Sequence, residues 1–538
     1  MKKILSISIL LVFIGCTDLD LEPKNGSVES VAFANFEGYQ SYIAKVYASL
    51  SITGQQGAAG QPDLSIINDE GFSSYLRVWW KAQELTTDEA IIAWTDSGIR
   101  DLHNHSWGAD NQFVRVLYYR LFFTISLAND FIRVASELPD GLSSDEIATI
   151  DQFVAEARFI RAFSYWHALD HFRNITLITS ITSDLPLQVE PEVVFDFIET
   201  ELNEIEDSLL PAGQANHDYG RVDQAAAWML KAKLYLNAQV YIGEDRFADC
   251  ITEANKVIDA NVYSLAPNYQ ELFMADNHVR TDEVIWPIVH DGLVSQTWGG
   301  TTTIIRASIG GAMQDDMKNG VPSSDEAESD YGVPDGWEGY RTTSAFVSLF
   351  PGAATNNGNS ADGRAIFFTE EQSLEISDIG EFTDGWAVPK FTNIEASTGR
   401  RAPGVDQVST DYPVFRLAEA YLMLAEAQVS SAAGSIDGTT LGYLNALRAR
   451  AYGDNSGDVT IADVDLDWIL DERGRELYLE ATRRTDLIRH KKFTGGDYIW
   501  PWKGGVEEGT STLSHLDIFP IPSSDLIANP KLDQNDDY

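Results

Sequence analysis

Hydrophobic positions recur at helical spacing in several long blocks of the chain. The clearest block covers residues 145–172, where apolar side chains follow one another at steps of three and four: Ile150, Phe153, Ala157, Ile160 and Phe163. This spacing places them on one face of an α-helix. Similar patterns predict that the chain is mostly helical, with helices mainly in residues 31–52, 111–262 and 411–492.

The helical pattern is lost in residues 54–110 and 263–410. Both segments are rich in Gly, Asp and Thr and carry isolated tryptophans. Compact domains rarely contain irregular stretches of this length unless the stretches have a function. We therefore expect one large domain, residues 31–538, in which short strands and loops form a ligand-binding half on a helical scaffold. The last part of this domain is a tail at 493–538.

Two helical blocks contain pairs that resemble tetratricopeptide repeats. Trp228, Ala232 and Tyr235 have the spacing of the first helix of such a repeat. Small alanines in the following helix would let the two helices approach closely. The repeats are degenerate and far apart, which indicates a scaffold rather than a regular array.

The N-terminus has the layout of a bacterial lipoprotein signal. A short basic start and an apolar run fill residues 1–15, and Cys16 follows directly. The run is too short to span a bilayer stably. We expect cleavage before Cys16, lipidation of that residue, and an acidic tether over residues 16–30. Phe13 departs from the usual leucine, and an ordinary secretory signal with an incidental cysteine is the alternative.

The charge balance excludes one class of partner. The chain has 38 basic and 82 acidic residues, a net charge of −44. Such a surface repels phosphate backbones, so we expect no nucleic-acid partner. His103 and His105 suggest a metal site, but residues two apart do not share a helix face and no third ligand lies nearby, so we expect no metal and no cofactor.

Several motifs along almost the whole chain resemble the SusD/RagB family of surface lipoproteins. They are the "CTDLDLEP" opening, "AEARFIRAFSYWHALDHF", "FRLAEAYLMLAEA", "LNALRARAYG", "ILDERGRELYLEATRRTDLIRHKKF" and the closing "IFPIPSSDLIANPKLDQNDDY". Each motif alone is weak evidence, but the ordered set is hard to obtain by chance.

The resemblance implies a glycan-binding lipoprotein, not an enzyme, on the outer face of the outer membrane of Bacteroidota-type bacteria. It also implies a partner, a TonB-dependent transporter of the SusC type, to which oligosaccharides are delivered. The fold implied is mostly α, a single domain with tetratricopeptide-like helix pairs and an irregular ligand-binding half.

Tryptophans in polar, irregular sequence are the candidate sugar platforms, because an aromatic ring can stack on the apolar face of a sugar. The candidates are Trp79, Trp80, Trp94, Trp298 and Trp337. Neighbouring groups that could bind the hydroxyls are Asp69, Asp88, Tyr340, Arg341 and Arg364. Packing in the core is the alternative for each tryptophan.

Two other functions stay open at this point. A secreted glycan-processing enzyme would use two of the many carboxylates as acid and base. A helical-repeat adaptor would bind proteins and no sugar.

Overall fold

The computed structural model describes residues 29–65, 69–181, 184–213, 218–279, 282–314, 331–404 and 406–538. The expected signal peptide, Cys16 and nearly all of the expected tether lie outside these residues. Within the described residues, no helix is long and apolar enough to cross a membrane.

The structure is mostly helical. The helices of the first half are α1 (Glu29–Ala32), α2 (Phe36–Ser51), α3 (Tyr75–Glu84), α4 (Arg100–Asn104), α5 (Gln112–Ala135), α6 (Ser144–Phe172), α7 (Pro191–Ile205), α8 (Gln224–Leu236), α9 (Ala238–Tyr241) and α10 (Phe247–Asp259). Those of the second half are α11 (Gly300–Ala307), α13 (Ser344–Val347), α14 (Leu417–Ser430), α15 (Gly438–Tyr452), α16 (Leu466–Leu477), α17 (Arg483–Arg489) and α18 (Ser523–Ala528).

Local sequence explains where the long helices begin. The Asn111 side chain accepts hydrogen bonds from the first backbone N–H groups of α5. Ser143 and Glu146 form a reciprocal capping box at the start of α6. Asp223 caps α8, and Pro191 occupies the first turn of α7, where its missing N–H costs no hydrogen bond.

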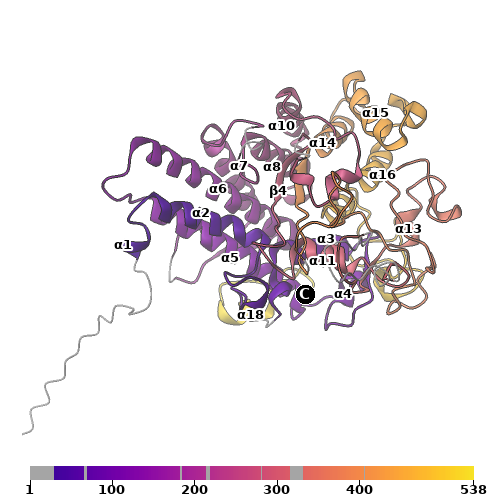
Figure 1. Ribbon diagram of the computed structural model, residues 1–538, viewed down its shortest axis with the longest axis horizontal. Helices are drawn as coiled ribbons and strands as arrows, with labels where there is room; N and C mark the ends of the chain where they lie inside the picture. The colour runs from indigo at the N-terminus through magenta and orange to yellow at the C-terminus, as the bar shows by residue number, and fades with distance from the viewer. Residues whose placement is uncertain are drawn as a thin grey trace, which may run out of the picture.

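The long helices pack side by side and form the scaffold (Figure 1). Helix α5 packs on α6, α6 on α7, α8 on α10, and α10 on α14. In α6, every residue from Phe159 to Phe172 is buried, so this helix runs through the centre of the core. The apolar spacing read from the sequence therefore locates the helix but understates how much of its surface is covered.

The strands are short and pair across long sequence distances. They are β1 (Ile91–Ile92), β2 (Ile175–Thr176), β3 (Gln188–Val189), β4 (Val284–Ile288), β5 (Tyr340–Arg341) and β6 (Tyr412–Arg416). Each belongs to a two-stranded antiparallel pair: β1 with β5, β2 with β3, and β4 with β6.

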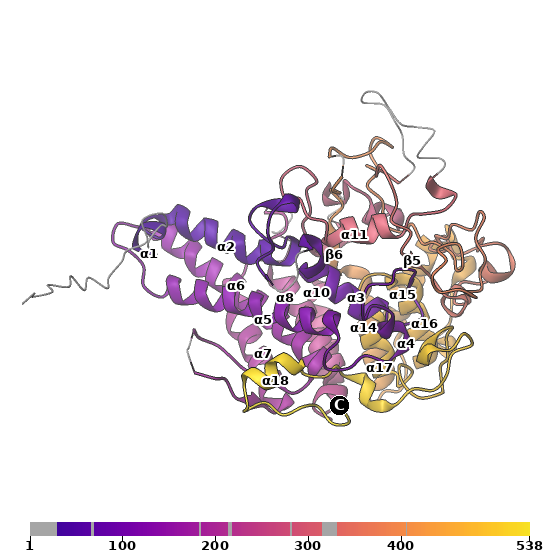
Figure 2. The ribbon, with the colours of Figure 1, turned by 90° about the horizontal axis from the view of Figure 1, so that it is seen from below.

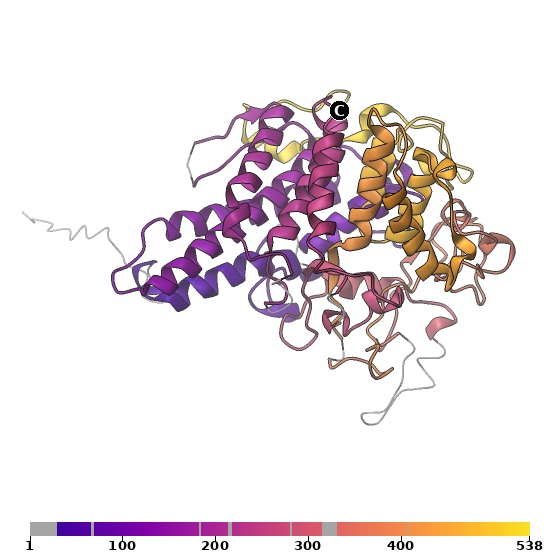
Figure 3. The same cartoon turned by 90° about the horizontal axis from the view of Figure 1, so that it is seen from above.

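The irregular segments lie together on the scaffold. Figures 2 and 3, seen from opposite sides, show the chain between α10 and α14 gathered along one side and at one end of the helices. The C-terminal tail runs along the opposite side. Helix α11 of the irregular region lies against α3 (Figures 1 and 2), and this contact positions the candidate site.

Helix α3 corrects the expectation that residues 54–110 are only loops and strands. All ten of its residues are buried. Its polar side chains, among them Arg77, Lys81 and Glu84, are buried together with its rings. The mixture of polar and aromatic residues suggests a loop, because burial of the polar residues depends on distant segments that cover the helix.

Candidate functional site

Three tryptophans from distant parts of the chain form a row of neighbouring aromatic rings, called the platform here. The ring centroids of Trp94 and Trp337 are 6.3 Å apart, and those of Trp337 and Trp298 are 6.1 Å apart. Each neighbouring pair is tilted by 48°, and all three residues are partly exposed. The structure thus brings together three of the five tryptophans that the sequence suggested.

Backbone hydrogen bonds fix the central ring between the other two. The N–H of Trp337 donates to the carbonyl of Arg306 in α11 at 2.7 Å. The indole Nε1 of Trp94 donates to the carbonyl of Trp337 at 2.8 Å. Gly339 follows, and a Cβ there would lie 3.0 Å from the Trp94 ring and 3.1 Å from Ala307. Only glycine therefore allows this close approach without displacing a neighbour.

A buried carboxylate positions the third ring. Glu70 accepts hydrogen bonds from the backbone N–H of Trp298 and from the Thr297 hydroxyl, both at 2.9 Å. A Cβ on Gly71 would approach the Trp298 backbone to 2.5 Å. Trp298 is thus held against residues 70–71 by contacts that its own sequence neighbourhood does not reveal.

Two cations of α3 lie next to the platform, and the sequence analysis missed both. Arg77 and Lys81 are four residues apart and therefore share one face of the helix. The Lys81 ammonium lies 5.4 Å from the Trp94 ring centroid. The Nε of Arg77 is buried and has no hydrogen-bond partner within the described part of the chain. The four-residue spacing of Arg77 and Lys81 in "LRVWWK" was the sequence signal that could have placed them on one helix face.

Charges around Lys81 are mixed in sign. Burial holds the pKa of Lys81 well below its usual value; nearby Arg77 adds to this shift, whereas Asp96 and Asp69 oppose it. Asp69, one of the expected hydroxyl-binding residues, is exposed. Its carboxylate gives this end of the platform an exposed hydrogen-bond acceptor, whereas Arg77 and Lys81 are buried beneath the surface.

Arg306 supports the other end of the platform. Its guanidinium carbon lies 4.9 Å from the centroid of Trp337 and 5.5 Å from that of Trp298. It also pairs with Asp335 and donates to the Asp406 carbonyl. A cation at these distances from an aromatic face is attracted to the ring, which rigidifies the pair of indoles.

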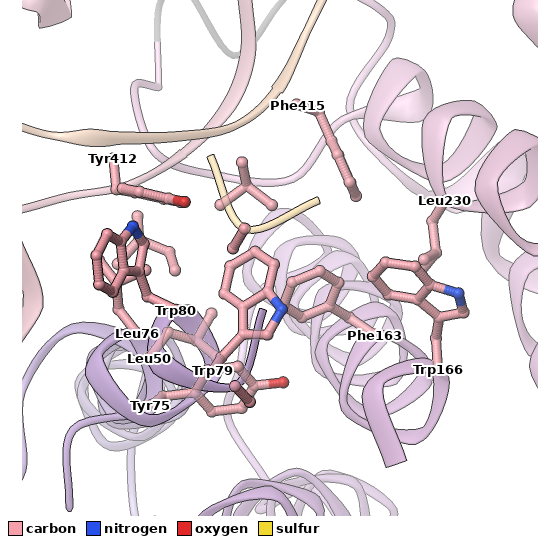
Figure 4. Packing of buried hydrophobic residues seen from close by; sticks show 14 of the residues in the cluster. Leu50, Tyr75, Leu76, Trp79, Trp80, Phe163, Trp166, Leu230, Tyr412 and Phe415 are labelled. Atoms are coloured by element: carbon pink, nitrogen blue, oxygen red, sulfur yellow. The ribbon is translucent and has the colours of Figure 1, made fainter. Parts of the chain in front are cut away.

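Trp79 and Trp80 are core residues, contrary to the expectation that they bind sugar. Their exposed fractions are 3% and 1%. Trp79 packs on Phe163 and Tyr412, as Figure 4 shows, and on His167. Trp80 donates its indole N–H to the carbonyl of Leu479 at 3.0 Å. Both project from the buried helix α3 into the core, so neither can reach a ligand.

Tyr340 lies beneath the platform. Its ring contacts those of Trp80 and Trp94, with centroids 4.6 Å and 6.0 Å away. Only 3% of its surface is exposed, and its hydroxyl is buried without a partner among the residues that the structure covers. Tyr340 therefore supports Trp94 instead of binding hydroxyls at the surface, which corrects the expectation.

Asp88 and Arg341 are also buried, and both bond other groups of the protein. Asp88 accepts two hydrogen bonds from Arg483, each 2.8 Å long. Arg341 donates to the backbone carbonyls of Asp384 and Ile379. Both were expected to bind sugar hydroxyls, and this expectation is wrong.

Arg364 belongs to the largest buried ion cluster among the residues described. It is fully buried and bonds Asp362, Glu472 and Glu476, the last at 2.9 Å. Burial alone would raise the pKa of Glu476, but Arg450, Arg416 and Arg364 hold it well below its usual value. Arg364 is therefore a structural residue, and its assignment to the site is wrong.

Two buried glutamates, one at the end of α3 and one in the turn before β1, bind the backbone of residues 479–481. Glu84 accepts from the backbone N–H of Ala481 at 2.6 Å, and Glu89 from that of Leu479 at 2.8 Å. Leu479 and Ala481 both have positive φ, 59° and 55°. Burial favours the protonated form of Glu84, and the charge of nearby Glu89 adds to this effect.

Burial raises the pKa of Glu84 well above its usual value and that of Glu89 to about 7. The folded protein thus binds protons that the unfolded chain releases near pH 4.5. The stabilisation from these protons is complete below that pH and is lost as pH rises through about 7 and beyond. Each bound proton contributes a slope of about 1.4 kcal/mol per pH unit.

Glu84→Gln is expected to reduce this pH dependence. The amide keeps an acceptor for the backbone N–H of Ala481 but cannot lose a proton. Urea unfolding of both proteins between about pH 5 and pH 8 measures the free energy of unfolding. Glu338→Gln, at an exposed position, is the control. Parallel curves for wild type and Glu84→Gln would contradict the raised pKa of Glu84.

Comparison with known proteins identifies the family. A protein named starch-binding protein SusD, from Bacteroides thetaiotaomicron, is 34% identical to this chain over 550 residues. The alignment covers 97% of this chain and 95% of that protein. The chain belongs to the SusD family. The model of the SusD family also matches residues 355–538.

More distant members of the SusD family agree with this result. SusD-like protein P2 from Formosa agariphila is 26% identical, covering 99% of this chain. Among solved structures, surface glycan-binding protein A from Bacteroides thetaiotaomicron in complex with laminarihexaose has a TM-score of 0.67 at 18% identity, covering 93% of this chain and 99% of its own. A laminarin-binding SusD-like protein has a TM-score of 0.65 at 21% identity, with the same coverage. The prediction of a mostly helical, single-domain SusD fold is confirmed.

Proposed function

We propose that this SusD-family protein is a cell-surface glycan-binding protein that captures oligosaccharides on the platform of Trp94, Trp298 and Trp337. The observation that carries the proposal is the row of partly exposed, mutually tilted indoles with exposed carboxylates nearby. Indole faces match the apolar faces of successive sugar rings, whereas Asp69 and Asp96 can accept hydrogen bonds from hydroxyls.

The tilt between neighbouring rings favours a curved glycan over a flat one. Two successive tilts of 48° suit a chain that turns from ring to ring, as α-1,4-glucans and β-1,3-glucans do. The relative that is 34% identical is named for starch, whereas the laminarin-binding structures are 18% and 21% identical. We therefore propose an α-1,4-glucan as the preferred ligand.

Calorimetric titration with maltoheptaose, laminarihexaose and cellohexaose tests this proposal. Three stacking contacts with hydrogen bonds could give about −4 to −6 kcal/mol, which corresponds to millimolar to tens of micromolar affinity. We expect maltoheptaose to bind most tightly and the flat cellohexaose most weakly. Equal binding of all three would contradict the role of curvature, and absence of binding would favour the adaptor. Hydrolysis of a probe would indicate a glycan-processing enzyme.

We further propose that Cys16 carries a lipid that holds the protein at the outer face of the outer membrane. The basic start, the apolar run and the position of Cys16 support this, together with the family. Replacing Cys16 with Ala is expected to move the protein from the membrane fraction to the soluble fraction and to abolish incorporation of labelled palmitate. Retention of the variant in the membrane with no label in either protein would refute the anchor.

Delivery to a SusC-type TonB-dependent transporter completes the proposal. Membership of the SusD family supports it, and helical scaffolds of this kind offer large surfaces to other proteins. Affinity purification from detergent-solubilised membranes should recover a much larger barrel protein with the tagged lipoprotein. Recovery of the lipoprotein alone, under conditions that keep other outer-membrane complexes intact, would argue against this partner.

A further inference from the structure

A cavity of about 490 Å³ opens between α2, α6, β4 and residues 218–221. None of the described residues that line it belongs to the tryptophan platform. Its volume is at the lower end of the roughly 300–1,000 Å³ found for small-molecule sites. A short ligand would therefore fit better than a long chain.

Two tyrosines form rigid, partly exposed walls of this cavity. The hydroxyl of Tyr47 donates to Glu156, and that of Tyr219 donates to Asp411, both at 2.6 Å. Because each hydroxyl is tied to a buried carboxylate, neither ring can turn freely. The two side chains are therefore already ordered, and little entropy is lost in ordering them when a ligand binds.

The rest of the lining is mostly apolar and carries a few charged groups. Phe153 and Trp286 form a buried apolar floor. Arg221, whose side chain is 25% exposed, bonds Glu156 and lies beside Asp218, whose side chain is 52% exposed. The cavity thus offers aromatic faces next to both hydrogen-bond donors and acceptors.

We propose that this cavity is a second saccharide-binding site, which accepts one or two neutral sugar residues. A sugar has apolar faces for Tyr47 and Tyr219 and hydroxyls that can both donate to Asp218 and accept from Arg221. A hydrocarbon would cover these charged groups without pairing them, which is costly. A charged ligand would meet both signs at once, because the Arg221 cation lies between the carboxylates of Glu156 and Asp218.

The site is tested in a protein whose platform is disabled by Trp298→Ala and Trp337→Ala. Saturation-transfer NMR with maltose and with laminaribiose as probes detects weak binding of small sugars. We expect this protein to keep a signal with at least one of the two disaccharides. No signal with either disaccharide would overturn the proposal.

Blocking variants identify where the remaining disaccharide binds. Ala44 and Val289 line the cavity, so Ala44→Trp and Val289→Trp, each added to the platform-disabled protein, should abolish the signal. Ser41→Trp, on the same helix but outside the lining, should leave it unchanged. A persistent signal in either blocked protein that melts like its parent would overturn the site.

Failure of the second site can be distinguished from failure of the proposed platform. If the platform is not the main site, wild type fails to bind maltoheptaose, or the platform-disabled protein binds it equally well. If only the second site is wrong, wild type binds maltoheptaose, and disaccharide binding either disappears with the platform or survives the blocking variants.

Discussion

Replacing Arg364 with Ala is expected to destabilise the protein by about 3–5 kcal/mol, because removing one partner leaves uncompensated buried charges. The side chain is fully buried, and its guanidinium bonds three carboxylates. Burial alone would raise the pKa of Glu472, but Arg364, Arg475 and Arg448 lower it to about 2. The substitution would remove one of these three cations.

Urea unfolding measures this effect. Arg400→Ala is the matched control, since Arg400 is exposed and should change the free energy of unfolding by less than about 0.5 kcal/mol. If Arg364→Ala instead unfolded like wild type and lost glycan binding, the original interpretation of Arg364 as a sugar-binding residue would be restored.

Replacing Trp337 with Ala is expected to weaken maltoheptaose binding by about 1–3 kcal/mol, through lost stacking and lost apolar contact. The melting temperature should change little, because Trp337 is partly exposed and the backbone carbonyl that accepts from Trp94 remains. This prediction rests on the proposed platform.

Trp80→Ala should have the opposite effect. Trp80 is 1% exposed, so the cavity left behind should cost about 3–5 kcal/mol of stability. Calorimetric titration and a thermal melt on both variants distinguish a ring that binds the glycan from a ring that packs in the core. Unchanged binding by Trp337→Ala, or unfolding of that variant at ambient temperature, would remove Trp337 from the site.

Some features could be predicted from the sequence because their signals are local. The period of α6, the caps of α5 and α6, and Pro191 at the start of α7 depend on residues within one or two turns. The isolated tryptophans 94, 298 and 337 were recognised for the same reason, since large rings in polar, irregular sequence stand out. The domain limits proposed from these patterns stay a prediction.

The tertiary structure alone decided which aromatic and charged residues face solvent. Trp79 and Trp94 looked alike in sequence, yet the first is packed on Phe163 and the second is paired with Trp337. Arg364 looked like a loop residue, and its partner Glu472 lies 108 positions away along the chain. Burial and ion pairing depend on segments that meet only in the folded protein. The sequence by itself therefore determined the long helices of the scaffold, the family resemblance and the kind of side chain at the site. The positions of those side chains were decided by contacts between segments hundreds of residues apart.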